Sequence, residues 1–125
     1  PITDAAVVPL VEKAKADFPD SFEHIGPVYG EQKFEFFNSI DVFLFPTRYR
    51  NESWGIVLNE ALMAGLPVIT LKRGCTAYLV GQIGGLVAHD NNFVTSAADQ
   101  VAYWIQNPDA YAIAKSNALT RGQQL

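Results

Sequence analysis

Apolar residues recur every three or four positions in several segments of the chain, which predicts amphipathic helices. The predicted helices cover residues 3–17, 30–40, 55–64, 93–106 and 108–118, and residues 76–83 add one or two further turns. Thr3 or Asp4 is the expected N-cap of the first helix. In the second helix, Phe34, Phe37 and Ile40 are expected to turn inward, because their spacing places them on one face.

Short and nearly continuous apolar runs lie between these helices and predict strands that are covered on both faces. They occupy residues 41–46, 67–71 and 84–88, and residues 22–28 predict one more short strand. Strands that alternate with helices of about 10 to 15 residues are typical of a parallel sheet with helices on both faces. The predicted fold class is therefore α/β, and the length of 125 residues fits a single domain over residues 1–125.

Composition and charge exclude several classes of protein. Hydrophobic residues make up 49% of the chain and charged residues 18%, as in a globular domain rather than a disordered segment. A net charge of −4 argues against a nucleic-acid-binding protein, and no apolar run approaches the roughly 20 residues that a membrane span needs. Neither end resembles a signal peptide. The single cysteine, Cys75, excludes an internal disulfide and a multi-cysteine metal cluster, and it fits a cytoplasmic location.

The stretch "YRNESWGIVLNEALMAGLPVI", residues 49–69, carries the candidate chemistry. It follows the predicted strand at 41–46, and ligands of parallel sheets bind at the carboxyl ends of the strands. The helix that begins near Gly55 has free amides at its start, so the backbone of Ile56 and Val57 could bind a phosphate group. Glu60 lies one turn further and is flanked by apolar residues. Because a buried carboxylate needs hydrogen-bonding partners, this arrangement suits a ligand that combines an anion with hydroxyl groups, such as a nucleotide diphosphate-sugar.

Both acids of this stretch also have simpler interpretations. Glu60 could be an acid that is stabilised only by the dipole at the start of its helix. Glu52 could be a solvated loop residue that pairs with Arg48 or Arg50.

A longer pattern resembles a known family. The segment "ESWGIVLNEALMAGLPVI" resembles the E-x7-E signature, followed by A-x-x-x-G-x-P-V-I, of the C-terminal donor domain of family-4 (group 1) glycosyltransferases. These are retaining enzymes of the GT-B fold. The upstream "IDVFLFPTRYRNE" and the downstream "LKRGC" and "GGLV" fall where the family has its counterparts, so the resemblance covers about residues 24–90. It implies a Rossmann-like parallel sheet with helices on both faces.

The resemblance implies a role for each matching residue. Glu60 would bind the ribose hydroxyls of the nucleotide, and Glu52 would contact hydroxyls of the transferred sugar without acting as a nucleophile. The backbone of Ile56 and Val57 would hold the diphosphate. The remaining donor-binding positions are Ser53, Trp54 and Gly55, in the loop around the sugar, and Val28 and Tyr29, near the base.

The resemblance also implies partners. The donor would be a nucleotide diphosphate-sugar, and the acceptor a saccharide or a lipid-linked saccharide, bound through an N-terminal domain that this chain does not contain. No metal or other cofactor is expected, and no nucleic acid. The full-length protein could lie at the inner face of a membrane and could act in polysaccharide biosynthesis.

The chain also departs from the family's pattern. It starts at about the helix that follows the second strand of the family's donor domain, so the first strands, with an Arg and a Lys that neutralise the diphosphate, have no counterpart. We therefore expect a fragment that is inactive alone and that could self-associate through the truncated edge of its sheet. The alternative is a noncatalytic α/β module that binds a nucleotide or a protein.

Overall fold

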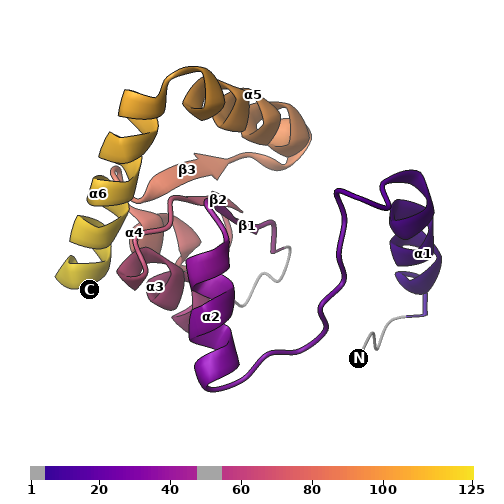
Figure 1. Cartoon of the computed structure of the whole chain (residues 1–125). Coiled ribbons are helices and arrows are strands. Elements are labelled where there is room, and N and C mark those ends of the chain that lie inside the picture. Colours follow the sequence, from indigo (N-terminus) through magenta and orange to yellow (C-terminus); the bar gives the residue numbers. More distant parts are fainter. Residues whose placement is uncertain (1–4, 48–54) are drawn as a thin grey trace. The chain divides into compact units, whose positions relative to one another are not determined.

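The computed structural model describes residues 5–47 and 55–125. The chain forms two compact units, which are divided between Phe36 and Phe37. The first unit contains helix α1 (Val8–Asp17) and most of helix α2 (Glu31–Ser39). The second unit contains the sheet and the remaining helices, and it carries most of the candidate site (Figure 1).

The second unit is built on a parallel sheet of three strands in the order β1-β2-β3. These strands are β1 (Phe43–Phe45), β2 (Val68–Leu71) and β3 (Gly85–Ala88). Phe43 pairs with Val68, and Val68 pairs with Gly85, so the three strands begin together. The prediction of an α/β fold with a parallel sheet flanked by helices is confirmed.

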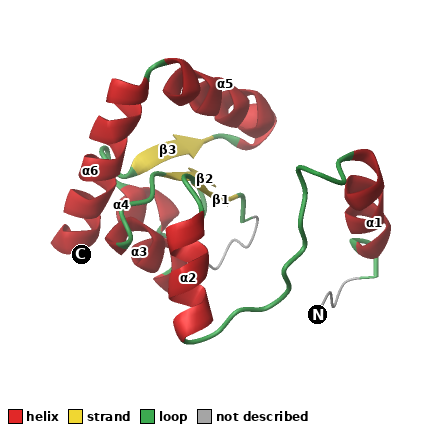
Figure 2. Cartoon of the chain, viewed as in Figure 1, coloured by secondary structure: helices red, strands yellow, loops and turns green. Residues whose placement is uncertain are grey.

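Helices cover both faces of this sheet (Figures 1 and 2). They are α3 (Ile56–Met63), α4 (Thr76–Val80), the short 3₁₀ helix η1 (Asp90–Asn92), α5 (Phe93–Gln106) and α6 (Pro108–Gln124). The helices α3 and α4 lie against one face, and α5 lies against the other. Ile69 of the central strand packs on Ala97 and Trp104 of α5. All four residues of β2 are buried, as expected of a strand with a neighbour on each side and helices on each face.

Close contact between α6 and α3 completes the second unit. Ala118 is fully buried, and Gly122 is buried on the same face of α6. A Cβ atom built on Gly122 would lie 2.8 Å from the backbone nitrogen of Met63 at the end of α3. Only a glycine therefore permits this distance between the two helices.

The Arg121 side chain joins α6 to the last turn of α4. Its Nε donates a hydrogen bond of 2.9 Å to the carbonyl of Leu79, and its Nη2 donates to the carbonyl of Tyr78. The guanidinium also lies over the Tyr78 ring, 5.3 Å from its centroid. These bonds satisfy two carbonyls in the last turn of α4, to which no amide of the helix itself donates.

The structure corrects the prediction of a strand at residues 22–28. Residues 22–29 have no regular secondary structure. A strand exists only where a neighbouring strand accepts its hydrogen bonds, and the described part of the first unit contains no strand.

Several predicted boundaries and faces also change. The helix predicted at 3–17 begins at Val8, with Pro9 in its first turn, where a proline fits; its proposed caps, Thr3 and Asp4, lie outside the described residues. The last helix continues to Gln124 instead of ending at 118. Phe37 is buried as predicted, whereas Phe34 is 66% exposed.

Strand β1 is covered less completely than predicted. It forms the edge of the sheet, and Leu44 in its middle is 51% exposed. On the opposite face, Phe43 makes an edge-to-face contact with Phe37 of α2, with ring centroids 5.7 Å apart. The apolar run of β1 therefore reflects burial of one face only.

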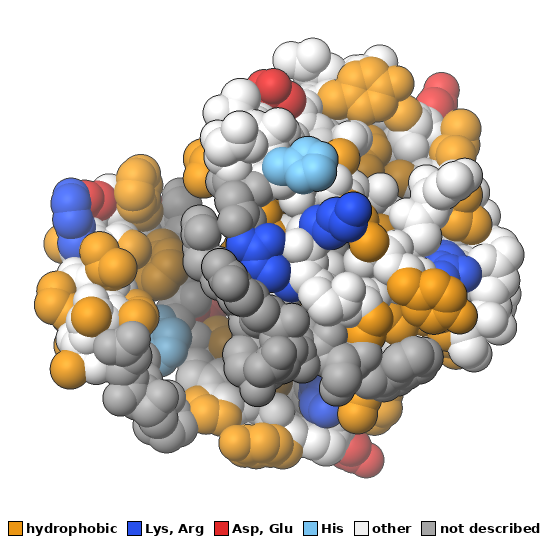
Figure 3. Space-filling model, turned by 180° about the vertical axis from the view of Figure 1, so that it is seen from behind, with side chains coloured by type: hydrophobic (Ala, Val, Ile, Leu, Met, Phe, Trp, Pro, Cys, Tyr) orange, Lys and Arg blue, Asp and Glu red, His pale blue; other side chains and the backbone are white. Residues whose placement is uncertain are grey.

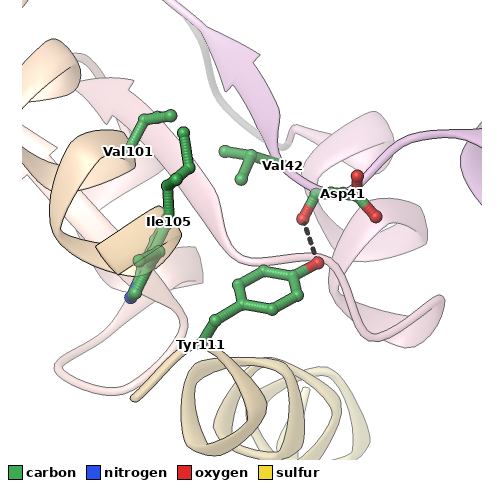
Figure 4. Close-up of a pocket in the computed structure, with 6 residues that line it drawn as sticks. Asp41, Val42, Val101, Ile105 and Tyr111 are labelled. Carbon is green, nitrogen blue, oxygen red and sulfur yellow. Dashed lines mark hydrogen bonds between the residues drawn. The ribbon is translucent and has the colours of Figure 1, made fainter. Parts of the chain in front are cut away.

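An apolar hollow of about 350 Å³ lies where β1 begins, between α5 and α6 (Figure 4). Val42, Val101 and Ile105 line it, and the Tyr111 hydroxyl donates a hydrogen bond of 2.7 Å to the carbonyl of Asp41. Partial burial, and the nearby carboxylate of Asp41, raise the pKa of Tyr111 above its ordinary value of 10.0. This bond joins α6 to the segment that leads into β1.

We predict that Gly122→Ala destabilises the chain by about 1–3 kcal/mol, because the added methyl group forces α6 away from α3. The sign is diagnostic, since glycine to alanine inside a helix otherwise stabilises by about 1 kcal/mol. Urea unfolding measures the change. Ser116→Ala, at an exposed position of α6, is the control and should be neutral or slightly stabilising. A stabilised Gly122→Ala variant would contradict the close helix contact.

We predict that Tyr111→Phe destabilises the chain by about 0.5–1.5 kcal/mol at neutral pH through loss of the bond to Asp41. Because the folded state holds the Tyr111 proton more tightly than the unfolded state, its contribution is complete below about pH 10 and is lost as the pH rises above that value. Unfolding of both proteins between pH 7 and 11 measures this. The difference between them should shrink at the alkaline end, and a constant difference would exclude the titration of Tyr111 as its cause.

Candidate functional site

The carboxyl ends of the three parallel strands meet at one edge of the sheet. The strands end at Phe45, Leu71 and Ala88, and the amide of Lys72 donates a hydrogen bond of 3.1 Å to the carbonyl of Ala88. The turn after β2 is therefore tied to the end of β3. In open parallel sheets this edge is where ligands bind.

Helix α3 begins at this edge, after the segment that follows β1. Its N-cap, Gly55, makes no side-chain cap, and the Gly55 carbonyl accepts the amides of Leu58 at 2.9 Å and Asn59 at 3.2 Å. The two preceding amides, those of Ile56 and Val57, belong to the helix start, where no carbonyl of the helix can accept them. Together with the helix dipole, they make this end of α3 suitable for an anion.

Packing explains why a glycine stands at the start of α3. Gly55 is buried, and a Cβ atom built on it would lie 3.3 Å from side-chain carbons of both Leu58 and Leu79. Gly55 therefore packs directly against the apolar core, with little room for a side chain between them. The backbone of α3 begins directly on the apolar layer, which fixes the place of its first turn.

Glu60 lies one turn into α3 and is half-buried, between the fully buried Leu58 and Ala61. The neighbouring Asn59 has a buried side-chain oxygen, Oδ1, that accepts no hydrogen bond from the described part of the protein. Polar side chains in such surroundings gain from a ligand that carries hydroxyl groups. The sequence did not point to Asn59, because an asparagine inside an apolar helix indicates nothing more than a weak helix former.

Positive charge gathers at the same edge. Lys72 and Arg73 follow β2, and Arg73 Nη1 donates a hydrogen bond of 2.8 Å to the carbonyl of Lys72. Figure 3 shows Lys and Arg side chains close together on the face that it presents. The sequence contained these residues in "LKRGC", but only the pairing of β2 with β3 places them beside the end of β3.

Comparison with protein families gives a match over nearly the whole chain. The family model described as glycosyl transferases group 1 matches residues 10–121. The chain belongs to this family. Comparison with curated proteins and with solved structures gives no significant match. Family membership confirms the resemblance to the group 1 glycosyltransferase donor domain, and it supports a glycosyltransferase role.

The structure of this group 1 glycosyltransferase domain brings together four of the predicted site residues. Gly55, Ile56, Val57 and Glu60 share the first turns of α3. Val28 and Tyr29 belong to the first unit; Tyr29 is 75% exposed, and Val28 lines a hollow between residues 22 and 36. The other predicted residues, Glu52, Ser53 and Trp54, lie outside the described residues, as do Arg48 and Arg50.

Neither a candidate metal cluster nor a membrane-spanning helix occurs in the described part of the chain. Within residues 5–47 and 55–125, no three His, Cys, Asp or Glu side chains lie close enough together to hold a metal ion. In the same part of the chain, no helix is both long and apolar enough to cross a membrane. Independence from a metal or cofactor stays a prediction.

Proposed function

We propose that this chain is the donor-binding part of a retaining glycosyltransferase whose donor is a nucleotide diphosphate-sugar. The observation that carries the proposal is the position of Glu60, half-buried and one turn from the start of α3, at the ligand-binding edge of the sheet. A helix start attracts the diphosphate, and a carboxylate one turn away accepts hydrogen bonds from sugar hydroxyls. The E-x7-E pattern supplies the second carboxylate, Glu52.

In this proposal, the backbone of Ile56 and Val57 binds the diphosphate, and Lys72 and Arg73 add positive charge beside it. Glu60 accepts hydrogen bonds from the ribose. Charge builds up on the diphosphate as its bond to the sugar breaks, so preorganised amides and cations lower the barrier to departure. These amides and cations stabilise the negative charge most strongly where water is excluded from the site.

The sugar part of the donor is assigned to the loop after β1. Glu52 contacts hydroxyls of the transferred hexosyl group and stabilises the positive charge that develops on it, and Ser53 and Trp54 shape the surrounding pocket. Val28 and Tyr29 contact the base. Neither a metal nor a protein nucleophile is part of this mechanism.

The proposal extends to partners and location. The acceptor is a saccharide or a lipid-linked saccharide, bound by a further domain of the full-length protein, and the chain alone is inactive. The product belongs to polysaccharide biosynthesis in the cytoplasm, at the inner face of the membrane. The exposed Leu44 on the edge strand β1 supports self-association of the isolated chain, since an open apolar edge favours pairing.

We predict that Glu60→Ala weakens binding of the preferred donor about 10-fold or more, because a hydrogen-bonded charged group is lost. The test is an NMR titration of the chain with UDP-glucose, GDP-mannose and ADP-glucose in turn. Donor binding should shift the amide signals of Ile56, Val57 and Glu60, and the preferred nucleotide identifies the base.

The matched control is Asp109→Ala, which removes an acid from the first turn of another helix, α6. It should leave donor affinity unchanged. A folded Glu60→Ala variant that binds as tightly as the wild-type chain would contradict the donor site and would favour the noncatalytic module.

A further inference from the structure

Two buried threonine hydroxyls donate hydrogen bonds to the last carbonyls of β1 and β2. Thr70 is fully buried, and its Oγ1 donates a hydrogen bond of 2.7 Å to the carbonyl of Phe45, the last residue of β1. A second oxygen, the carbonyl of Leu71, lies 3.3 Å from the same Oγ1. Because a hydroxyl has one proton, the shorter contact identifies the Phe45 carbonyl as the acceptor.

Thr76 makes a more extensive set of bonds at the end of β2. It is fully buried, and its Oγ1 donates a hydrogen bond of 2.7 Å to the carbonyl of Leu71, the last residue of β2. The same oxygen accepts the amide of Arg73 at 2.9 Å, and the amide of Thr76 donates to the carbonyl of Arg73 at 2.9 Å. The turn of residues 73–76 is thus closed by two reciprocal bonds and fixed to the strand behind it.

Valine has nearly the same shape as threonine, but it could make none of these bonds. Each hydroxyl is tolerated in its buried place because it is satisfied, and what it satisfies is backbone at the carboxyl edge of the sheet. The Thr76 hydroxyl binds the last carbonyl of β2 and the amide of Arg73, the two backbone groups on either side of Lys72.

We infer that Thr76 is a positioning residue for donor binding, an inference that rests on the proposed function. Thr76 fixes the turn that carries Lys72 and Arg73, and thereby sets where their charge meets the diphosphate. Thr70 is equally buried, but its hydroxyl binds the end of β1 and not this turn.

Thr76→Val removes the acceptor of the Arg73 amide and loosens the turn, so it should weaken binding of the nucleoside diphosphate and of the nucleotide-sugar alike, each by about 3- to 10-fold. Thr70→Val is the matched control, because it removes an equally buried hydroxyl outside this turn. It should leave the affinity for the nucleoside diphosphate within about 2-fold of the wild-type value.

The experiment measures dissociation constants of the full chain by NMR titration, with the preferred nucleotide-sugar and with its nucleoside diphosphate. Thr76→Ser keeps the hydroxyl and should restore affinity to within about 2-fold of the wild-type value. Thr120→Val, at an exposed position of α6, is the control for the substitution itself. Ile69→Val shortens a buried side chain of β2 without removing a hydroxyl, and it controls for lost stability.

A second readout does not depend on ligand. In Thr76→Val, the amide of Arg73 should exchange with solvent about tenfold faster or more, because its acceptor is gone, while the amides of β2 keep their protection. Unchanged exchange at Arg73 would overturn the role of Thr76 in fixing the turn.

The outcomes separate this inference from the proposed function. If the wild-type chain binds a nucleotide-sugar and Thr76→Val binds it equally well, the positioning role is wrong and the donor site stands. The same conclusion holds if Ile69→Val or Thr70→Val weakens binding of the nucleoside diphosphate as much as Thr76→Val does, since lost stability would then be the cause. If the wild-type chain binds no nucleotide or nucleotide-sugar at millimolar concentration, the proposed function fails and the inference fails with it.

Discussion

Burial of strand β2 is the constraint on which the second unit depends. Each of its four residues is buried, and the strand has a hydrogen-bonded neighbour on both sides. Side chains alternate along a strand, so Ile69 faces α5 and Thr70 faces the opposite layer. The same short segment therefore holds together the sheet and both helical layers, and a change in it affects all three.

The position of the candidate site follows from this core. Helix α3 packs with Leu58, Ala61 and Leu62 inward, and α6 approaches it so closely that Gly122 has no room for a side chain. A helix held on two sides cannot slide along its axis without breaking packed contacts. Its first turn, with the amides of Ile56 and Val57, is therefore held in a fixed place at the carboxyl edge of the sheet.

Polar groups at this edge are arranged by the backbone beneath them. Lys72 and Arg73 follow β2, and the pairing of β2 with β3 places them beside the end of β3, where the Lys72 amide binds the Ala88 carbonyl. The turn that carries them is closed by the Thr76 hydroxyl, and Glu60 is brought to the same edge by α3. Backbone amides, cations and a carboxylate thus lie in one region, which is the combination that the proposed nucleotide diphosphate-sugar requires.

The sequence by itself determined the alternation of helices and strands, the parallel sheet and the motif on α3, because these depend on hydrophobic period and local turn chemistry. It did not determine whether residues 22–28 form a strand or how far β1 is covered, because both depend on neighbours distant in the sequence. Among the candidate site residues, Glu60 and the start of α3 were predicted from local pattern. Thr76 and Asn59 were not, since a threonine or asparagine becomes informative only when its hydrogen-bond partners and burial are known. Local pattern fixed what the elements are, and tertiary packing decided which backbone and side-chain groups meet at the edge of the sheet.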